Sequence, residues 1–117
     1  MDNDLITRIN CLIKQIDCAL SDVNGKTVDE FSKSDLLVRA TCFSLVQIGE
    51  QMIRIEEKLK DRYPDIPWIK AKRLRNLIVH IYNKVDAAQI YDTATRNLPE
   101  LKESFVEIKN AIMSEVN

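Results

Sequence analysis

The chain has 117 residues, with 17 lysines and arginines against 18 aspartates and glutamates and a single histidine, so its formal net charge is -1. This length suits one domain over residues 1–117, and 45% hydrophobic with 30% charged residues excludes a disordered or membrane-spanning chain. The chain starts with acidic residues, unlike a signal peptide, and no apolar run approaches the roughly 18 residues of a membrane span. We therefore expect a cytoplasmic protein without a membrane partner.

The first predicted helix covers about residues 3–23, where apolar residues recur every three or four positions. An Asn-Gly pair follows, and Gly25 supplies a helix stop that tolerates positive φ. Thr27 and Glu30 then have the spacing of a capping box, which predicts a short helical turn.

A second long helix is predicted over about residues 35–61, with Ser34 as its N-cap. Gly49 lies inside this helix at a cost of about 1 kcal/mol relative to alanine, so we expect a close contact with another helix there. The predicted buried stripe of this helix consists of Leu37, Ala40, Phe43 together with Ser44, Ile48, Met52, Ile55 and Leu59.

Two further helical stretches complete the chain. Pro67 suits the first turn of a third helix that continues to about residue 85. The stretch after Asp86 is helical in pattern, and Pro99 should kink or split it. Its apolar stripe consists of Ile90, Ala94, Leu98, Leu101, Phe105, Ile108, Ile112 and Val116. The predicted fold is all-α, an antiparallel up-and-down bundle of four to five helices.

The cysteines do not indicate a disulfide framework or a zinc site, because Cys11, Cys18 and Cys42 are odd in number and form no Cys-x-x-Cys pair. We expect three reduced thiols in or near helical core positions. Since the chain has one histidine and no carboxylate cluster beside it, we also predict no metal site and no cofactor.

Residues 68–85 divide into two faces when they are placed on a helix at about 100° per residue. One face holds Leu74, Leu77, Ile78, Ile81 and Val85, and the other holds Lys72, Asn76, His80 and Asn83. Five cationic residues and no acidic ones lie between residues 70 and 84, which leaves -1 minus 5, or -6, for the rest of the chain. A cationic face on an acidic protein suits a phosphate-bearing ligand, while the alternative is a solvated helix face that happens to be basic.

Residues 75–82 read Arg-Asn-Leu-Ile-Val-His-Ile-Tyr, which has the form Arg-x-x-x-x-His-x-Tyr with Asn directly after the Arg. This pattern resembles the HEPN superfamily, and most closely its HepT-like branch, the toxin half of HepT/MntA toxin–antitoxin pairs. Residues 48–50, 62–68, 85–86 and 98–101 resemble flanking segments of that family in the same order. The resemblance therefore spans nearly the whole chain and implies the HEPN helical bundle.

The resemblance also implies a metal-independent endoribonuclease that cleaves RNA phosphodiesters. A histidine titrates near neutral pH, so His80 suits the role of general acid or base, and the planar fork of Arg75 suits phosphate oxygens. Asn76 would orient the imidazole or bind substrate, and Lys72 and Arg73 would bind substrate.

One histidine per chain makes an acid–base pair awkward, and HEPN relatives are dimeric. We expect a homodimer in which a two-fold axis brings two copies of Arg75 and His80 into one basic cleft. Val79 and Trp68, which are apolar residues on the polar face, are the expected seam contacts.

The resemblance further implies a partner, an MntA-like nucleotidyltransferase antitoxin that transfers AMP onto the motif tyrosine, here Tyr82. The added negative charge would repel RNA from the cleft. Many relatives have glycine where this chain has Ile81, and a β-branched residue there favours continued helix or extended backbone.

Two alternatives to a ribonuclease toxin remain at this point. One is a non-catalytic HEPN subunit that binds nucleotide or substrate for a separate nucleotidyltransferase, against which the presence of both Arg75 and His80 argues. The other is a plain interaction bundle whose polar face is incidental. A neighbouring gene with a Gly-Ser…Asp-x-Asp nucleotidyltransferase pattern would favour the ribonuclease toxin and the non-catalytic subunit over the plain interaction bundle.

Overall fold

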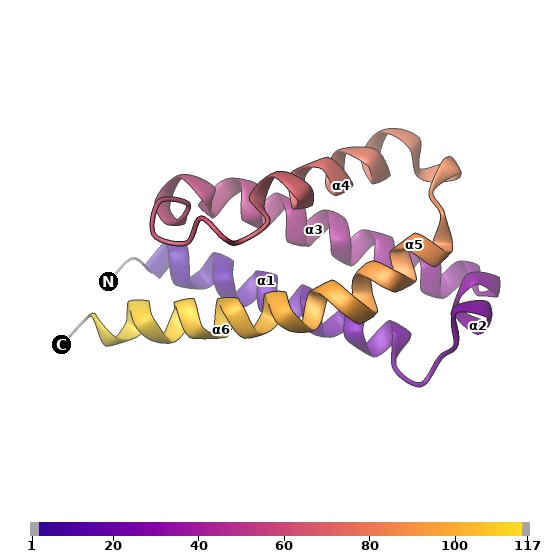
Figure 1. The fold of residues 1–117 in the computed structure, drawn as a ribbon, viewed down its shortest axis with the longest axis horizontal. Coiled ribbons are helices and arrows are strands. Elements are labelled where there is room, and N and C mark those ends of the chain that lie inside the picture. The colour runs from indigo at the N-terminus through magenta and orange to yellow at the C-terminus, as the bar shows by residue number, and fades with distance from the viewer. Residues whose placement is uncertain (1–2, 116–117) are drawn as a thin grey trace.

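The computed structural model describes residues 3–115, and the prediction of an all-α helical bundle is confirmed. Its four long helices pack side by side (Figure 1), and two short helices, α2 and α5, contact each other near one end of the bundle. In chain order the helices are α1 (Asn3–Val23), α2 (Val28–Lys33), α3 (Asp35–Leu59), α4 (Trp68–Ile81), α5 (Ala87–Asp92) and α6 (Leu98–Ser114). No described helix is long and apolar enough to cross a membrane.

Local signals set the ends of the first helices, as the sequence predicts. After α1, Gly25 adopts a φ of 72°, a conformation that glycine reaches without a steric penalty. The side-chain oxygen of Thr27 accepts a hydrogen bond from the Glu30 amide, and the Glu30 carboxylate accepts one from the Thr27 amide. Ser34 caps α3 by accepting a hydrogen bond from the Leu37 amide.

The core lies between α1, α3 and α6, whose apolar stripes face one another. The apolar side chains of Ile9, Leu12 and Ile16 in α1 have no exposed surface, and burying such a side chain contributes about 1.5–3 kcal/mol. The predicted stripe of α3 is wrong at one position, because Phe43 is 59% exposed and its neighbour Ser44 is buried instead. The most enclosed core side chains include Ile9, Leu12, Ile16, Phe31, Met52, Ile55, Leu59, Ile90 and Phe105.

The expected break near Pro99 takes the form of a π-helical segment over Thr93–Asn97, between α5 and α6. A proline lacks the amide donor and its ring clashes with the carbonyl four residues earlier, so an α-helical ladder cannot pass through it unchanged. The backbone hydrogen bonds here join residues five apart instead of four, and the Leu98 amide donates to the carbonyl of Thr93. The C-terminal stripe nevertheless stays buried as predicted through Ile112, whereas Val116 lies outside the described residues.

The third long helix is shorter than predicted. Helix α4 ends at Ile81, whose φ of -137° and ψ of 40° leave the helical region, and residues 82–84 form a 3₁₀ turn. The apolar face predicted for residues 74–85 is also only partly buried, because Ile78 is enclosed but Ile81 is 39% exposed. The physical reason is that α4 packs against α3 and stands away from α6 (Figure 1).

Candidate active site

The closest approach between α3 and α4 lies at Gly49, as the sequence predicts. A Cβ atom placed on Gly49 would lie 2.6 Å from the Cβ of Arg75 and 3.3 Å from the carbonyl oxygen of Ala71. Both atoms are fixed to the α4 backbone, so a side chain at this position would push the two helices apart. Gly49 therefore sets the depth at which Arg75 sits against α3.

Two side chains hold the guanidinium of Arg75. The Glu50 carboxylate accepts a hydrogen bond from Nε at 2.5 Å, and the side-chain oxygen of Asn76 accepts one from Nη1. Because a guanidinium has five N–H groups, these two contacts leave three of them for a further anion. The Arg75 and Glu50 side chains are 26% and 32% exposed, so the pair is accessible from solvent.

Glu50 was not among the site residues predicted from the sequence. It lies 25 positions before Arg75, and its own helix gives no sign of a partner on another helix. The available signal was its place next to Gly49, the one position in α3 where the missing side chain marks a close helix contact.

Of the remaining predicted site residues of α4, Lys72, Arg73 and His80 are exposed and Asn76 is partly buried, and they do not all face the same way. His80 makes no hydrogen bond to any described residue. The Asn76 oxygen bonds Arg75 rather than the imidazole. Arg73 lines a cavity between α4 and the α5–α6 region, on a different side of α4 from Arg75.

Tyr82 follows the end of α4 and is 40% exposed. Partial burial raises the pKa of its phenol, and the nearby Cys42 and Asp35 raise it further while Arg39 lowers it. All three neighbours belong to the first half of α3. Tyr82 therefore lies within electrostatic range of the first half of α3, two turns along α4 from the Arg75–Glu50 pair, with its hydroxyl neutral at neutral pH.

Trp68 is not available for the seam contact that the sequence predicts. Its side chain is 5% exposed and packs edge-on against Phe105, with ring centroids 6.0 Å apart. Its indole nitrogen donates to the carbonyl of Tyr63 at 3.0 Å. Trp68 thus anchors the start of α4 to α6, and of the two predicted seam residues Val79 is the exposed one, at 53%.

The thiols differ from the prediction that all three lie in or near core positions. Cys42 is buried, whereas Cys11 and Cys18 are exposed on α1, and all three are free. Burial raises the pKa of the Cys42 thiol to about 11. Among residues 3–115, no three His, Cys, Asp or Glu side chains gather in a group that could hold a metal ion.

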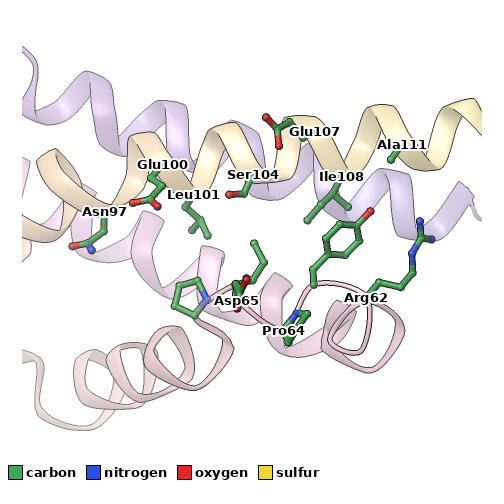
Figure 2. Close-up of a pocket in the computed structure, with 13 residues that line it drawn as sticks. Arg62, Pro64, Asp65, Asn97, Glu100, Leu101, Ser104, Glu107, Ile108 and Ala111 are labelled. Atoms are coloured by element: carbon green, nitrogen blue, oxygen red, sulfur yellow. The ribbon is translucent and has the colours of Figure 1, made fainter.

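A groove of about 610 Å³ lies between the loop after α3 and the side of α6 (Figure 2). Its lining includes the carboxylates of Asp65, Glu100 and Glu107 above an apolar floor that contains Leu101 and Ile108. These carboxylates repel phosphate groups. The groove is therefore unsuited to RNA, and the cationic face of α4 is the surface that suits a polyanion.

Comparison with known proteins identifies the family to which the chain belongs. Residues 9–108 match the family model described as ribonuclease HepT-like. A candidate RNase of Caldanaerobacter subterraneus subsp. tengcongensis is 26% identical over 97 residues, which cover 83% of this chain and 87% of that protein. A candidate RNase of Methanocaldococcus jannaschii is 33% identical over 81 residues, covering 68% of this chain and 67% of that protein.

A third relative, named "Probable ribonuclease HepT", comes from Thermococcus cleftensis and is 29% identical over 91 residues. The aligned part covers 70% of this chain and 83% of that protein. No solved structure gives a significant match. Since the family match includes α3, α4 and every residue of the candidate site, the chain belongs to the HepT-like ribonuclease family.

Proposed function

We propose that this protein is a toxin-type, metal-independent endoribonuclease that cleaves RNA at the face of α4 bearing Arg75, Asn76 and His80. The observation that supports this proposal most strongly is the Arg75 guanidinium, which Glu50 and Asn76 hold in place while three of its N–H groups stay free. A guanidinium with a free edge is suited to two oxygens of one phosphate. Membership of the HepT-like family, with relatives named as ribonucleases, supports the same activity.

The proposed reaction is attack by an RNA 2′-hydroxyl on the adjacent phosphorus. A new bond from the 2′ oxygen to phosphorus forms as the bond to the 5′ oxygen breaks, which gives a 2′,3′-cyclic phosphate and a 5′-hydroxyl. One imidazole removes the proton from the 2′-hydroxyl and another supplies a proton to the departing 5′ oxygen, while Arg75 stabilises the charge on the phosphorane. Lys72 and Arg73 add positive potential that attracts the RNA backbone.

Two imidazoles require two chains, so we propose that the active form is a homodimer. Large apolar side chains are exposed on α3 and α4, with Leu36, Phe43 and Val79 at 69%, 59% and 53%. Leu36 and Phe43 are seven residues apart and share one face of α3. Because Arg75 lies beside Gly49 and Tyr82 near Cys42, Val79 lies at the level of the α3 residues in between. This apolar patch, Leu36, Phe43 and Val79, is the proposed dimer seam.

We further propose that Tyr82 is the site at which an MntA-like nucleotidyltransferase antitoxin inactivates the toxin. Its hydroxyl oxygen would attack the α-phosphorus of ATP, forming the phosphotyrosyl bond and releasing pyrophosphate, with the proton passing to a base of the antitoxin. Tyr82 is 40% exposed, which gives the antitoxin access to it. The added AMP brings negative charge to the cationic face and lowers its affinity for RNA.

RNA cleavage by the purified protein in the presence of a metal chelator tests the catalytic assignment. We expect cleavage with cyclic phosphate ends, and a loss of about 10²–10⁴-fold in His80→Ala. Arg54→Ala, which removes an exposed arginine of α3, is the matched control and should keep full activity. Equal cleavage by the wild type and a folded His80→Ala variant would reject catalysis and favour the non-catalytic, nucleotide-binding subunit.

The dimer is tested separately by light scattering of a Phe43→Asp variant. We expect this charge in the apolar patch to give a monomer with little RNase activity, because burying an unpaired carboxylate is costly. Val106→Asp changes an exposed valine of α6 and should remain dimeric. A wild-type monomer that cuts RNA would contradict the proposal.

The modification is tested by intact mass after incubation with the cognate nucleotidyltransferase and ATP. We expect added AMP on the wild type and none on Tyr82→Phe. Addition of AMP that persists in Tyr82→Phe would show that another residue is the acceptor.

A further inference from the structure

A second cavity, of about 430 Å³, lies between α4 and the α5–α6 region; Gly49 is part of its lining, but Arg75 and Glu50 are not. We call it the α4–α6 groove. Its floor comes from α3 and its walls from α4 and the helices that follow it. The apolar lining consists of Leu45, Ile48, Pro67, Ala71, Leu74, Leu77, Leu98 and Leu101. A volume above about 300 Å³ with a mainly apolar lining is typical of sites for small ligands.

Two contacts fix the position of α4 beside the groove. Helix α4 is fixed to α3 at Gly49, and its first turn is anchored through Trp68 against Phe105. The opposite wall includes Thr93 and Asn97, the two ends of the π-helical segment. A π-helical turn carries an energetic cost and often occurs at functional sites. The leucine side chains that α4 contributes to the groove, Leu74 and Leu77, are only partly buried.

Charged groups lie along one wall of the groove. Lys70 and Arg73, both from α4, line it, and neither forms an ion pair with any described residue. The other wall presents the neutral polar side chains of Gln89, Thr93 and Asn97, for which the described residues provide no side-chain hydrogen bond. The groove thus combines an apolar floor with two cations and several hydrogen-bonding groups.

We propose that the α4–α6 groove binds a small amphipathic anion, an apolar molecule that carries one carboxylate. Its apolar body packs against Leu74 and Leu77, and its carboxylate forms ion pairs with Lys70 and Arg73 at the wall of the groove. Charge complementarity selects this class of ligand. The neighbouring groove of Figure 2 carries the three carboxylates of Asp65, Glu100 and Glu107, so an anion enters the α4–α6 groove in preference.

Fluorescence titration with 8-anilinonaphthalene-1-sulfonate, which has an apolar body and one anionic group, tests the site directly. We expect a saturable signal with one site per chain, displaced by decanoate. In a variant that carries both Lys70→Gln and Arg73→Gln, decanoate should bind about three- to tenfold more weakly. Uncharged 1-decanol should bind this variant and the wild type equally. Lys84→Gln, which changes an exposed lysine outside the groove, is the matched control and should behave as the wild type.

Two variants that fill the groove from opposite walls locate the binding. Thr93→Phe and Leu77→Trp should each abolish the displaceable signal, and circular dichroism identifies which of them is folded. No saturable signal in the wild type, or an unchanged signal in a folded filling variant, would overturn the proposal. Equal loss of decanoate and decanol binding in the doubly neutral variant would overturn its charge selectivity. These readouts do not involve RNA, so they are independent of the proposed RNase activity.

Discussion

Helix α3 packs very differently on its two sides. Toward α1 and α6 it meets fully enclosed side chains such as Ile9, Leu12 and Phe105. Toward α4 the two helices also lie close together, but fewer side chains are enclosed, since Trp68 and Ile78 are the only buried residues of α4. In the proposed ribonuclease, stability and chemistry would therefore depend on different helices. Because α4 buries little, most of its surface is free to present charged groups.

Two of the contacts between α3 and α4 also shape the candidate site. Gly49 sets the distance between α3 and α4, and Glu50 holds the guanidinium of Arg75. A change on the α4 side should therefore affect RNA cleavage more than stability, whereas a change on the α1–α6 side should do the opposite. The following variants test this division, beginning with the largest expected effect.

Phe105→Ala removes a side chain that is fully enclosed on the α1–α6 side. We expect the free energy of unfolding to fall by about 3–5 kcal/mol, because the change loses buried apolar surface and leaves a cavity. Chemical denaturation measures this loss. Val106→Ala, at the neighbouring exposed position, should stay within about 0.5 kcal/mol of the wild type. The rate of RNA cleavage per folded molecule should be nearly unchanged in both variants, and a large fall in that rate for Phe105→Ala would break the division.

Gly49→Ala should show the opposite pattern. The new Cβ would lie 2.6 Å from the Cβ of Arg75, so α4 must move away from α3. The better helix propensity of alanine, about 1 kcal/mol, offsets much of a packing cost of about 1–3 kcal/mol, so stability changes little. The displaced Arg75 should nevertheless slow cleavage by up to about 10²-fold. Denaturation and cleavage assays on the same sample separate the two effects, and unchanged cleavage would show that the depth of Arg75 is unimportant.

The same division explains which features could be predicted from the sequence. Helix 3–23, the Thr27–Glu30 capping box and the cap at Ser34 depend on neighbouring residues, so local patterns were sufficient. The end of α4 at Ile81 was missed, because helical periodicity continues through residue 85 while the backbone turns. Phe43 was assigned to the core because apolar character does not reveal that this side of α3 lies beside α4 and is left open.

The candidate site was predictable only in part for a related reason. Arg75, His80 and Tyr82 fall in one short segment, so a sequence motif reveals them. The pairing of Glu50 with Arg75 joins two helices and requires the tertiary structure. The same holds for the position of Arg73 in the α4–α6 groove, which depends on where α6 lies.

Glu50→Gln examines the α4 side without altering helix packing. Glutamine keeps an acceptor oxygen but removes the charge, so the ion pair to Arg75 is lost from a partly exposed site. We expect kcat for RNA cleavage to fall about tenfold, in line with about 1–1.5 kcal/mol for a charge-assisted hydrogen bond. KM should not rise, because the substitution also removes a negative charge that repels phosphate. Glu57→Gln, which changes an exposed glutamate seven residues further along α3, is the matched control. A rise in KM with unchanged kcat would instead assign Glu50 to substrate binding.

Substitution of Cys42 should have the smallest effect on stability. The reactivity of its thiol reports how well the surrounding surface of α3 is shielded from solvent. Burial raises the pKa of its thiol to about 11, so ionisation is easier in the unfolded chain, where a thiol has a pKa of about 8.5. Because the thiol ionises more easily in the unfolded chain, the buried neutral thiol stabilises the folded state fully below pH 8.5, and this stabilisation is lost as pH rises toward 11. Denaturation of Cys42→Ala should therefore show a weaker fall in stability over that window than the wild type. At pH 8 a thiol reagent should modify Cys11 and Cys18 readily and Cys42 only on unfolding, because reaction requires an accessible thiolate. Rapid labelling of Cys42 in the folded protein would mean that α4 opens from α3 far more often than its contacts at Gly49 and Glu50 suggest.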